Sequence, residues 1–300
     1  MTAEPHKSDG RSNPGPELHE GMDASPACHL LHGLGASWVC DETLARTARA
    51  DILEEQKVMK EKMVALVTGA NKGLGKQVAK ELVGHGYTVL LGSRDFANGQ
   101  RAAEEIGEGA VAIQLDVTDA MSIANAAERV TAEFGRLDLL VNNAAISQSG
   151  RYASGLSASA APLDEVRAVF DTNVFGVLAV TQAMLPLIRS SSTGRILNVS
   201  SGVGSLTLNS DPDFPFRPYF GVTYPASKTA LNAMTLALSI ELEGTGIKVR
   251  AASPSYTATA INDFQGTDSV EVGARPLVLA ALDTESPTGS FTGPDGAYPW

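Results

Sequence analysis

Val-Ala-Leu-Val-Thr-Gly-Ala-Asn-Lys-Gly-Leu-Gly, residues Val64 to Gly75, joins an apolar run to a glycine-rich turn. The run Val64 to Val67 has the length and composition of a buried parallel strand. Gly73 and Gly75 then lead into residues 76–83, whose apolar positions have helical spacing. A diphosphate can approach such a turn because side chains are missing, and the helix N-terminus directs N–H groups at it. The turn predicts an anion site. Its Gly-x-x-x-Gly-x-Gly spacing differs from the usual dinucleotide fingerprint, so a tight strand–helix connection stays open as the alternative.

The rest of the chain alternates strand-like and helix-like segments. We expect strands at residues 64–67, 88–92, 110–115, 137–142, 195–200, 248–252 and 289–292. Helical patterns lie at residues 73–84, 97–106, 120–134, 163–188, 224–243 and 270–282, with a bend near Pro186. This alternation predicts an α/β fold, a doubly wound parallel seven-stranded sheet with helices on both faces. A ligand binds such a sheet beyond the C-terminal ends of its strands.

Composition excludes several classes of function. The chain has 300 residues, 43% of them hydrophobic, and a formal net charge of −11. This acidity argues against nucleic acid or an anionic membrane as a partner. No run of 18 apolar residues and no apolar segment near the N-terminus are present, so we expect neither a membrane span nor a signal peptide. The two cysteines, Cys28 and Cys40, do not form a disulfide framework, which favours a cytoplasmic location.

Residues 1–58 differ from the rest and form a low-complexity N-terminal extension. Residues 1–26 are rich in Pro, Gly, Ser, Glu and Asp, a composition that buries too little apolar surface to order itself. Two Cys and two His lie between Cys28 and Cys40, but their spacing matches no familiar zinc pattern, and we expect no metal. Residues 43–60 are compatible with a short polar helix. We expect this arm to be disordered and one folded domain to follow it, residues 59–300.

Two cations lie where a nucleotide's adenosine ribose is expected. Ser93 and Arg94 follow the second strand. A carboxylate at this place would accept a hydrogen bond from the ribose 2′-hydroxyl, whereas an arginine favours a 2′-phosphate. Lys72, inside the glycine turn, adds a second positive charge. We therefore expect NADP(H) as the cofactor, with two ordinary surface cations as the alternative.

Polar residues also follow the later strands. Asp116 and Val117 end the third strand, near the expected adenine, and residues 142–145, Asn-Asn-Ala-Ala, end the fourth. Ser200-Ser201 closes the fifth strand, and the next helix opens with Tyr224-Pro-Ala-Ser-Lys228. Residues four apart share one helix face, so the lysine lies near the phenol and favours phenolate, lowering a pKa of about 10. Such a phenol is a general acid for carbonyl reduction, and a neighbouring serine can hold the carbonyl oxygen.

In combination these motifs resemble the short-chain dehydrogenase/reductase family, from about Val64 to the C-terminus. The resemblance lies in Thr68-Gly69-x-x-x-Gly73-x-Gly75, Asn142-Asn143-Ala144, Asn173, Ser201, Tyr224-x-x-x-Lys228 and Pro254. It implies a Rossmann fold and hydride transfer with a nicotinamide cofactor. It also implies that Tyr224 is the acid/base, that Lys228 binds the nicotinamide ribose, and that Ser201, rather than Ser200, holds the substrate. Asn173 would hold a proton-relay water through its backbone.

The cofactor-binding residues that follow from the motifs and the resemblance lie after the first four strands and the sixth strand, and on the helix that begins at Tyr224. They are Gly69, Asn71, Lys72, Gly73, Leu74, Gly75, Arg94, Asp116, Val117, Asn143, Ala144, Tyr224, Lys228, Pro254, Thr257 and Thr259.

The sequence departs from the family's pattern at three places. Ala145 replaces a usual glycine, which is a small change. Ser255 stands where the family has Gly after Pro254, and it would be strained if the position needs a positive φ. Residues 202–223 are longer than the usual connection and include the aromatic, proline-rich segment 211–220.

The long connection and the ending at Pro299-Trp300 are similar to carbonyl-reductase-like members of the family. This similarity favours reduction of a ketone or aldehyde, a small-molecule carbonyl substrate. An alcohol or steroid dehydrogenase working oxidatively is an alternative, and so is a non-catalytic NADP-sensing regulator. The presence of Asn173, Ser201, Tyr224 and Lys228 argues against the regulator, which needs no acid/base pair. The resemblance implies that the helix beginning at Tyr224 makes subunit contacts, as the corresponding helix often does in the family. The aromatic insertion would block such contacts. A monomer and a homodimer therefore both stay open.

The composition of the extension makes its removal a test of the domain boundary. A shortened chain that begins at Met59 should keep its melting temperature within a few degrees and its turnover nearly unchanged, because no core residue is lost. Thermal unfolding and steady-state kinetics of the full and shortened chains measure this. Loss of soluble expression on shortening would show that the extension packs against the domain.

Overall fold

Strand β1, Val64–Thr68, lies inside the sheet and is buried along its whole length. It pairs in parallel with β2 (Thr88–Ser93) on one side and with β4 (Leu139–Asn142) on the other. The structure is a computed structural model that describes residues 62–147 and 158–300. The predicted helix at residues 43–60 and the cysteines and histidines of the extension lie outside these described residues.

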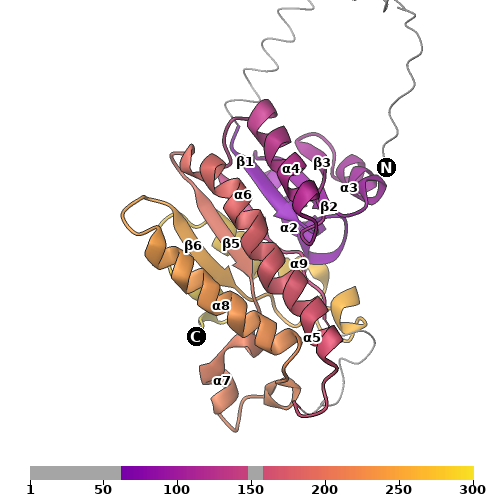
Figure 1. The fold of residues 1–300 in the computed structure, drawn as a ribbon, viewed down its shortest axis with the longest axis vertical. Helices are drawn as coiled ribbons and strands as arrows, with labels where there is room; N and C mark the ends of the chain where they lie inside the picture. The colour runs from indigo at the N-terminus through magenta and orange to yellow at the C-terminus, as the bar shows by residue number, and fades with distance from the viewer. Residues whose placement is uncertain (1–61, 148–157) are drawn as a thin grey trace, which may run out of the picture. The chain divides into compact units, whose positions relative to one another are not determined.

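The sheet has the strand order β3-β2-β1-β4-β5-β6-β7-β8 (Figure 1). The remaining strands are β3 (Ala110–Gln114), β5 (Arg195–Val199), β6 (Lys248–Ala252), β7 (Phe291–Gly293) and β8 (Gly296–Ala297). The doubly wound arrangement of seven parallel strands is confirmed. The structure adds β8, which pairs antiparallel to β7. A strand of two residues is too short to show a hydrophobic period, so the sequence pattern did not reveal it.

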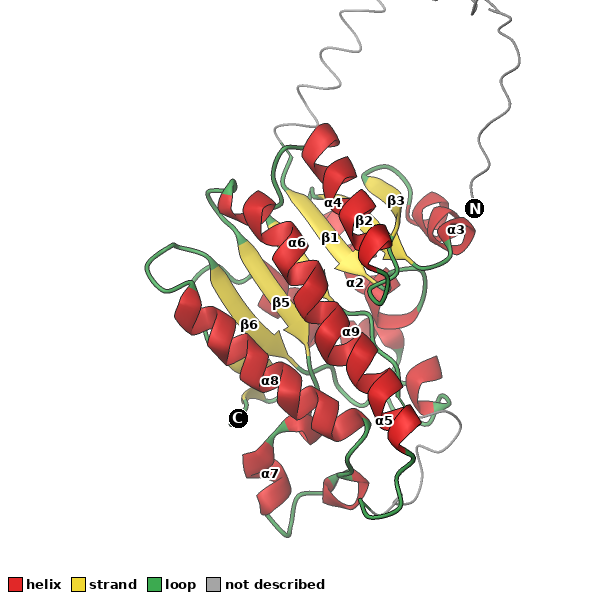
Figure 2. Cartoon of the chain, viewed as in Figure 1, coloured by secondary structure: helices red, strands yellow, loops and turns green. Residues whose placement is uncertain are grey.

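Helices cover both faces of the sheet (Figure 2). They are α2 (Gly73–Gly84), α3 (Phe96–Ile106), α4 (Ala120–Glu133), α5 (Leu163–Phe170), α6 (Val177–Arg189), α7 (Leu206–Ser210), α8 (Tyr224–Glu241) and α9 (Val270–Leu282). Short 3₁₀ turns are η2 (Gly202–Gly204), η3 (Arg217–Tyr219) and η4 (Ala260–Asn262).

Alternate residues of the strands point into two apolar cores. Leu66 of β1 belongs to the core beneath α4, α6 and α8, which contribute Ile123, Val180 and Leu238 among others. Its neighbour Val67 belongs to the core on the other face, beneath α2, α3 and α9. Both faces of the parallel sheet are thus covered by helices, which is why its strands read as continuous apolar runs.

The long helix predicted at residues 163–188 is interrupted, but the interruption does not lie near Pro186, where the sequence analysis expected a bend. A π-helical segment, η1 (Asp171–Gly176), separates α5 from α6, and Pro186 lies inside α6. Among the described residues, only Leu163–Arg189 is long and apolar enough to cross a membrane by length and composition. Here its residues Val180, Met184 and Ile188 pack in the core against the sheet, which accounts for its apolar character.

A buried carboxylate ties the N-terminal ends of the central strands together. Asp138, 4% exposed, precedes β4 and accepts hydrogen bonds from the backbone N of Val64 at 2.7 Å and from Ser191 Oγ at 2.5 Å. Arg136 Nε lies 3.2 Å from its Oδ2. The residues predicted to bind the cofactor follow the opposite, C-terminal ends of these strands.

Candidate functional site

The turn after β1 has the backbone conformation that its glycines predicted. Gly69 and Gly73 have φ values of +64° and +55°, which favour glycine. A Cβ at Gly75 would lie 2.3 Å from Asn143 Nδ2, so only glycine allows this close approach. No side chain of the described part of the chain caps α2, whose N-cap is Lys72. The first-turn N–H groups are therefore free for an anion.

Thr68 and Asn143 connect the turn to the end of β4. Thr68 Oγ1 accepts hydrogen bonds from the backbone N of Asn143 at 3.0 Å and of Ala144 at 2.9 Å. In return, Asn143 Nδ2 donates to the carbonyl oxygens of Thr68 and Gly69 at 2.9 and 3.2 Å. These four bonds fix the turn against its neighbouring strand. The sequence had assigned Asn143 to the cofactor, and the role of the Thr68 hydroxyl was missed.

Both predicted phosphate-binding cations are exposed. Lys72 lies in the turn after β1 and Arg94 directly after β2. Within residues 62–147 and 158–300, neither side chain forms an ion pair. Asp116, the predicted adenine contact, accepts hydrogen bonds at Oδ1 from the N and Oγ1 of Thr118 at 2.9 and 2.7 Å. Its carboxylate is thereby fixed at the end of β3.

The two serines after β5 have different surroundings. Ser200 is 1% exposed and donates inward to Asn232 Oδ1 at 2.5 Å. Ser201 is half-buried at the edge of the sheet, directly before η2. The geometry therefore favours Ser201 over Ser200 as the hydroxyl that can meet a substrate.

Tyr224 begins α8, and Lys228 lies one turn further along the same helix. Lys228 Nζ lies 5.5 Å from the centre of the Tyr224 ring and donates to the carbonyl of Val199 at 2.7 Å. The lysine is 2% exposed, and this burial lowers its pKa from 10.5 to about 7. Burial thus favours the neutral amine and opposes the cationic form that is expected to acidify the phenol.

Asn173 lies in the π-helical segment η1 and is fully buried. Its side chain donates to the carbonyl of Ile146 at 2.8 Å and to Ser227 Oγ at 3.0 Å, and accepts from the N of Ile146 at 2.9 Å. The amide is therefore fully used, which leaves the backbone for the predicted water. A π-helical turn alters the backbone pairing at this place, as such turns often do at functional sites. Ser227, inside the Tyr-x-x-x-Lys pattern, is a partner that sequence reasoning missed.

The loop after β6 returns to the glycine turn. Thr259 is buried, and its methyl group would lie 3.8 Å from a Cβ at Gly73. Thr257 Oγ1 donates to the carbonyl of Ser255 at 2.9 Å. The strain considered for Ser255 is absent, because Asp263 and Phe264 are the described non-glycine residues with positive φ. Ser255 therefore replaces the family's glycine without a left-handed backbone.

The insertion's aromatic residues reach this loop. The ring of Phe216 lies 5.5 Å from that of Tyr256, 5.8 Å from Phe214 and 6.4 Å from Tyr219. We call Phe214, Phe216, Tyr219 and Tyr256 the aromatic cluster. Phe220, in the same aromatic segment, is 41% exposed. Tyr256 was missed by the sequence analysis, although it lies two residues after Pro254.

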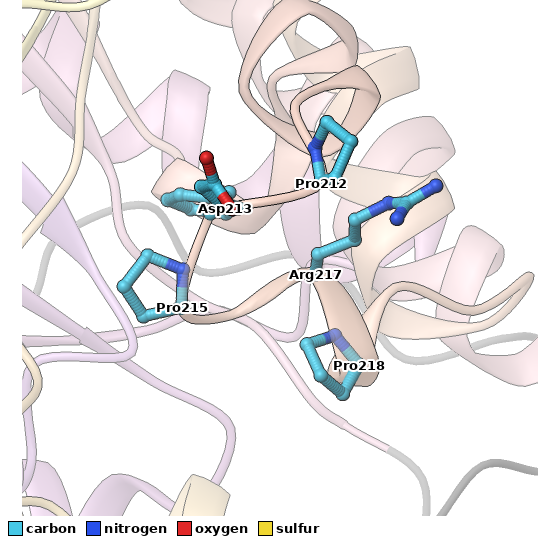
Figure 3. A pocket seen from close by; sticks show the side chains of 6 residues that line it. Pro212, Asp213, Pro215, Arg217 and Pro218 are labelled. Carbon is cyan, nitrogen blue, oxygen red and sulfur yellow. The ribbon is translucent and has the colours of Figure 1, made fainter.

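A pocket of about 520 Å³ lies within the insertion itself (Figure 3). Its lining residues are Pro212, Asp213, Phe214, Pro215, Arg217 and Pro218. None of the four candidate catalytic residues, Asn173, Ser201, Tyr224 and Lys228, lines this pocket. No group of three or more His, Cys, Asp or Glu suited to a metal occurs among the described residues.

The lowered pKa of Lys228 has a measurable effect on stability. Between pH 7 and 10.5 the unfolded chain binds the lysine proton more strongly than the folded protein does, so the free energy of unfolding rises with pH through this window. In Lys228→Met this contribution is absent. Urea unfolding at pH about 6.5, 8 and 9.5 should show wild type gaining stability relative to the variant as pH rises. A difference that stays constant with pH would contradict the buried, easily deprotonated lysine.

Comparison with known proteins agrees with this geometry. A short-chain dehydrogenase of Penicillium roqueforti is 35% identical over 231 residues, which cover 74% of this chain and 89% of that protein. Salutaridine reductase from Papaver somniferum has a similar structure, with a TM-score of 0.67, 29% identity, and coverage of 77% of this chain and 99% of that one. The 3-ketoacyl-(acyl-carrier-protein) reductase from Brucella melitensis, complexed with NADH, has a TM-score of 0.65, 26% identity, and coverage of 77% and 96%.

The family model described as short chain dehydrogenase matches residues 63–269, which include the glycine turn and the candidate catalytic residues. The chain therefore belongs to the short-chain dehydrogenase/reductase family, whose members are oxidoreductases that bind a nicotinamide cofactor and act on small molecules.

Proposed function

We propose that the protein reduces a ketone or aldehyde with NADPH, using Tyr224 as the general acid. The observation that carries this proposal is the pairing of Tyr224 with the buried Lys228, 5.5 Å from its ring, on the helix that follows Ser201. A sensor of the cofactor would need no such acid next to a hydroxyl that can hold a carbonyl. The name of salutaridine reductase, a structural relative, also favours reduction.

The residues at the sheet edge fit a dinucleotide. The uncapped N-terminus of α2 and the positive-φ glycines support a cradle for the diphosphate, and Lys228 and Thr259 are proposed to hold the nicotinamide half. When bound, the cofactor supplies a hydride to the carbonyl carbon. The Brucella relative is complexed with NADH, so the preference for NADPH rests on Lys72 and Arg94 alone.

Side chains of the protein stabilise and then neutralise the negative charge that develops on the carbonyl oxygen. Ser201 donates a hydrogen bond to this oxygen as negative charge grows on it. Tyr224 then transfers its phenolic proton to the same oxygen. Lys228 stabilises the phenolate when it is protonated, and a water at the backbone of Asn173 returns the proton. We further propose that the reaction takes place in the cytoplasm.

Replacing Arg94 by Asp should raise the KM for NADPH about ten- to a hundredfold and leave the KM for NADH almost unchanged. Charge-assisted hydrogen bonds to a 2′-phosphate are worth about 1.5–3 kcal/mol, and a carboxylate would repel the phosphate. Steady-state kinetics with both cofactors measure the effect. Arg275→Asp, at an exposed arginine of α9, is the control for the change in charge. Equal use of NADPH and NADH by the wild type would contradict the preference.

Tyr224→Phe should lower ketone reduction by about 10²–10⁴-fold because it removes the proton donor while keeping the ring. Ser201→Ala should lower it by about 10²–10³-fold, the cost of a lost oxyanion donor. Both variants should still bind NADPH, which fluorescence titration measures. Ser290→Ala is the control and should keep full activity, because the Ser290 hydroxyl has no hydrogen-bond partner among the described residues. If Tyr224→Phe binds NADPH and turns over ketones at nearly the wild-type rate, the mechanism is wrong and the regulator hypothesis returns.

The aromatic residues of the insertion are proposed to line the substrate site. Phe216→Ala combined with Phe220→Ala should change the ratio of kcat/KM between aromatic and aliphatic ketones, because Phe216 contacts Tyr256 of the loop after β6. The melting temperature should change little. Phe96→Ala, at a half-exposed residue of α3, is the control. A loss of stability with unchanged preference would show that the insertion is only a surface loop packed on the core.

A further inference from the structure

Ser253 is a buried serine that the sequence analysis did not select. It directly follows β6 and is 4% exposed. Its hydroxyl accepts a hydrogen bond from the backbone N of Gly202 at 3.0 Å and donates one to the carbonyl of Pro254 at 2.9 Å. One hydroxyl thus connects the turn after Ser201 with the start of the loop that holds the cofactor candidates.

The bond to Gly202 constrains the peptide unit that follows the substrate serine. The N–H of Gly202 and the carbonyl of Ser201 belong to the same planar unit. Ser253 holds the N–H, and the N of Gly204 donates to the carbonyl of Ser201 at 2.8 Å. Because both ends of this plane are held, the backbone that carries the Ser201 hydroxyl has one orientation.

The sheet does not need the hydrogen bond from Gly202 to the Ser253 hydroxyl, because separate backbone hydrogen bonds hold the strand ends at this place. The N of Ser200 donates to Ala252 at 2.8 Å, and the N of Ser253 donates to Thr292 at 2.8 Å. These two bonds continue the sheet and hold the strands together without the Ser253 hydroxyl. What the hydroxyl adds is a link between the two loops beyond the strand ends.

We propose that Ser253 is a positioning residue, which fixes the Ser201 hydroxyl relative to the loop that begins at Pro254. This inference rests on the proposed function. A carbonyl held by Ser201 must face the hydride donor in one geometry, and small displacements of a positioning group lower the rate strongly. Ser253 acts through Ser201 and does not touch the substrate.

The test is a double-mutant cycle between Ser253→Ala and Ser201→Ala. Alone, Ser253→Ala should lower kcat for ketone reduction about tenfold or more, with a smaller change in the dissociation constant of NADPH. In the Ser201→Ala background it should change kcat less than about threefold, because the group it positions is already gone. Ser290→Ala is the matched control: its buried hydroxyl has no hydrogen-bond partner among the described residues, so neither background should respond.

A second readout is independent of turnover. Hydrogen exchange of the backbone amides in residues 200–205 should be about tenfold faster in Ser253→Ala than in wild type and unchanged in Ser290→Ala. If the alanine variant does not fold, Ser253→Cys keeps the side-chain size with weaker hydrogen bonding, and should show a smaller loss in the same direction.

The outcomes separate the two proposals. Equal losses of kcat in both backgrounds, or unchanged exchange at residues 200–205, would overturn the role of Ser253. A wild type that binds NADPH but reduces no ketone or aldehyde would overturn the proposed function, and hydrogen exchange would still decide whether Ser253 holds the turn.

Discussion

The hydrogen bonds between Thr68 and Asn143 are the constraint on which the site depends. Thr68, 1% exposed at the end of β1, receives two backbone N–H groups from the end of β4, and Asn143 returns two bonds to the glycine turn. Beyond these ends β1 leads to α2 on one face of the sheet, and β4 is followed by α5 and α6 on the other face. Open α/β sheets bind ligands where the connections of two neighbouring strands diverge in this way. The glycines shape the turn, but this link fixes where the turn lies against the sheet.

Beneath the crevice, buried polar side chains continue the same connections through the core. Asn142 Nδ2 donates to Asn198 Oδ1 at 2.9 Å, and Asn198 Nδ2 donates to Thr235 Oγ1 at 2.8 Å, which joins β4, β5 and α8. The buried amide donors of Asn142 and Asn198 are paired in this arrangement, although Asn142 Oδ1 has no partner among the described residues. Because a buried donor is costly to leave unpaired, these bonds favour one register of the strands and one position of α8. Because α8 carries Tyr224 and Lys228, the polar core sets the place of the proposed acid.

The sequence predicted the order and type of nearly all helices and strands. A parallel sheet that is buried on both faces needs apolar residues at successive strand positions, so its strands are visible in the sequence as apolar runs. The sequence also brought together Tyr224 and Lys228, which are close by helical periodicity alone. It could not predict β8, the π-helical segment at Asn173 or the bond from Ser253 to Gly202, since these depend on contacts between segments distant in the chain. The lowered pKa of Lys228 was missed for a similar reason, because burial depends on what packs over the side chain rather than on its spacing from Tyr224.

Transfer of a hydride to a carbonyl carbon, at the C-terminal ends of these strands, is the reaction that we propose for this protein. The most direct measurement uses NADPH with deuterium at both C4 positions of the nicotinamide, incubated with the protein and a panel of ketones and aldehydes. Mass spectrometry of the products should find an alcohol with one deuterium on the former carbonyl carbon and an equal amount of NADP⁺. An alcohol without deuterium, or no alcohol from any member of the panel while NADPH is bound, would contradict this account.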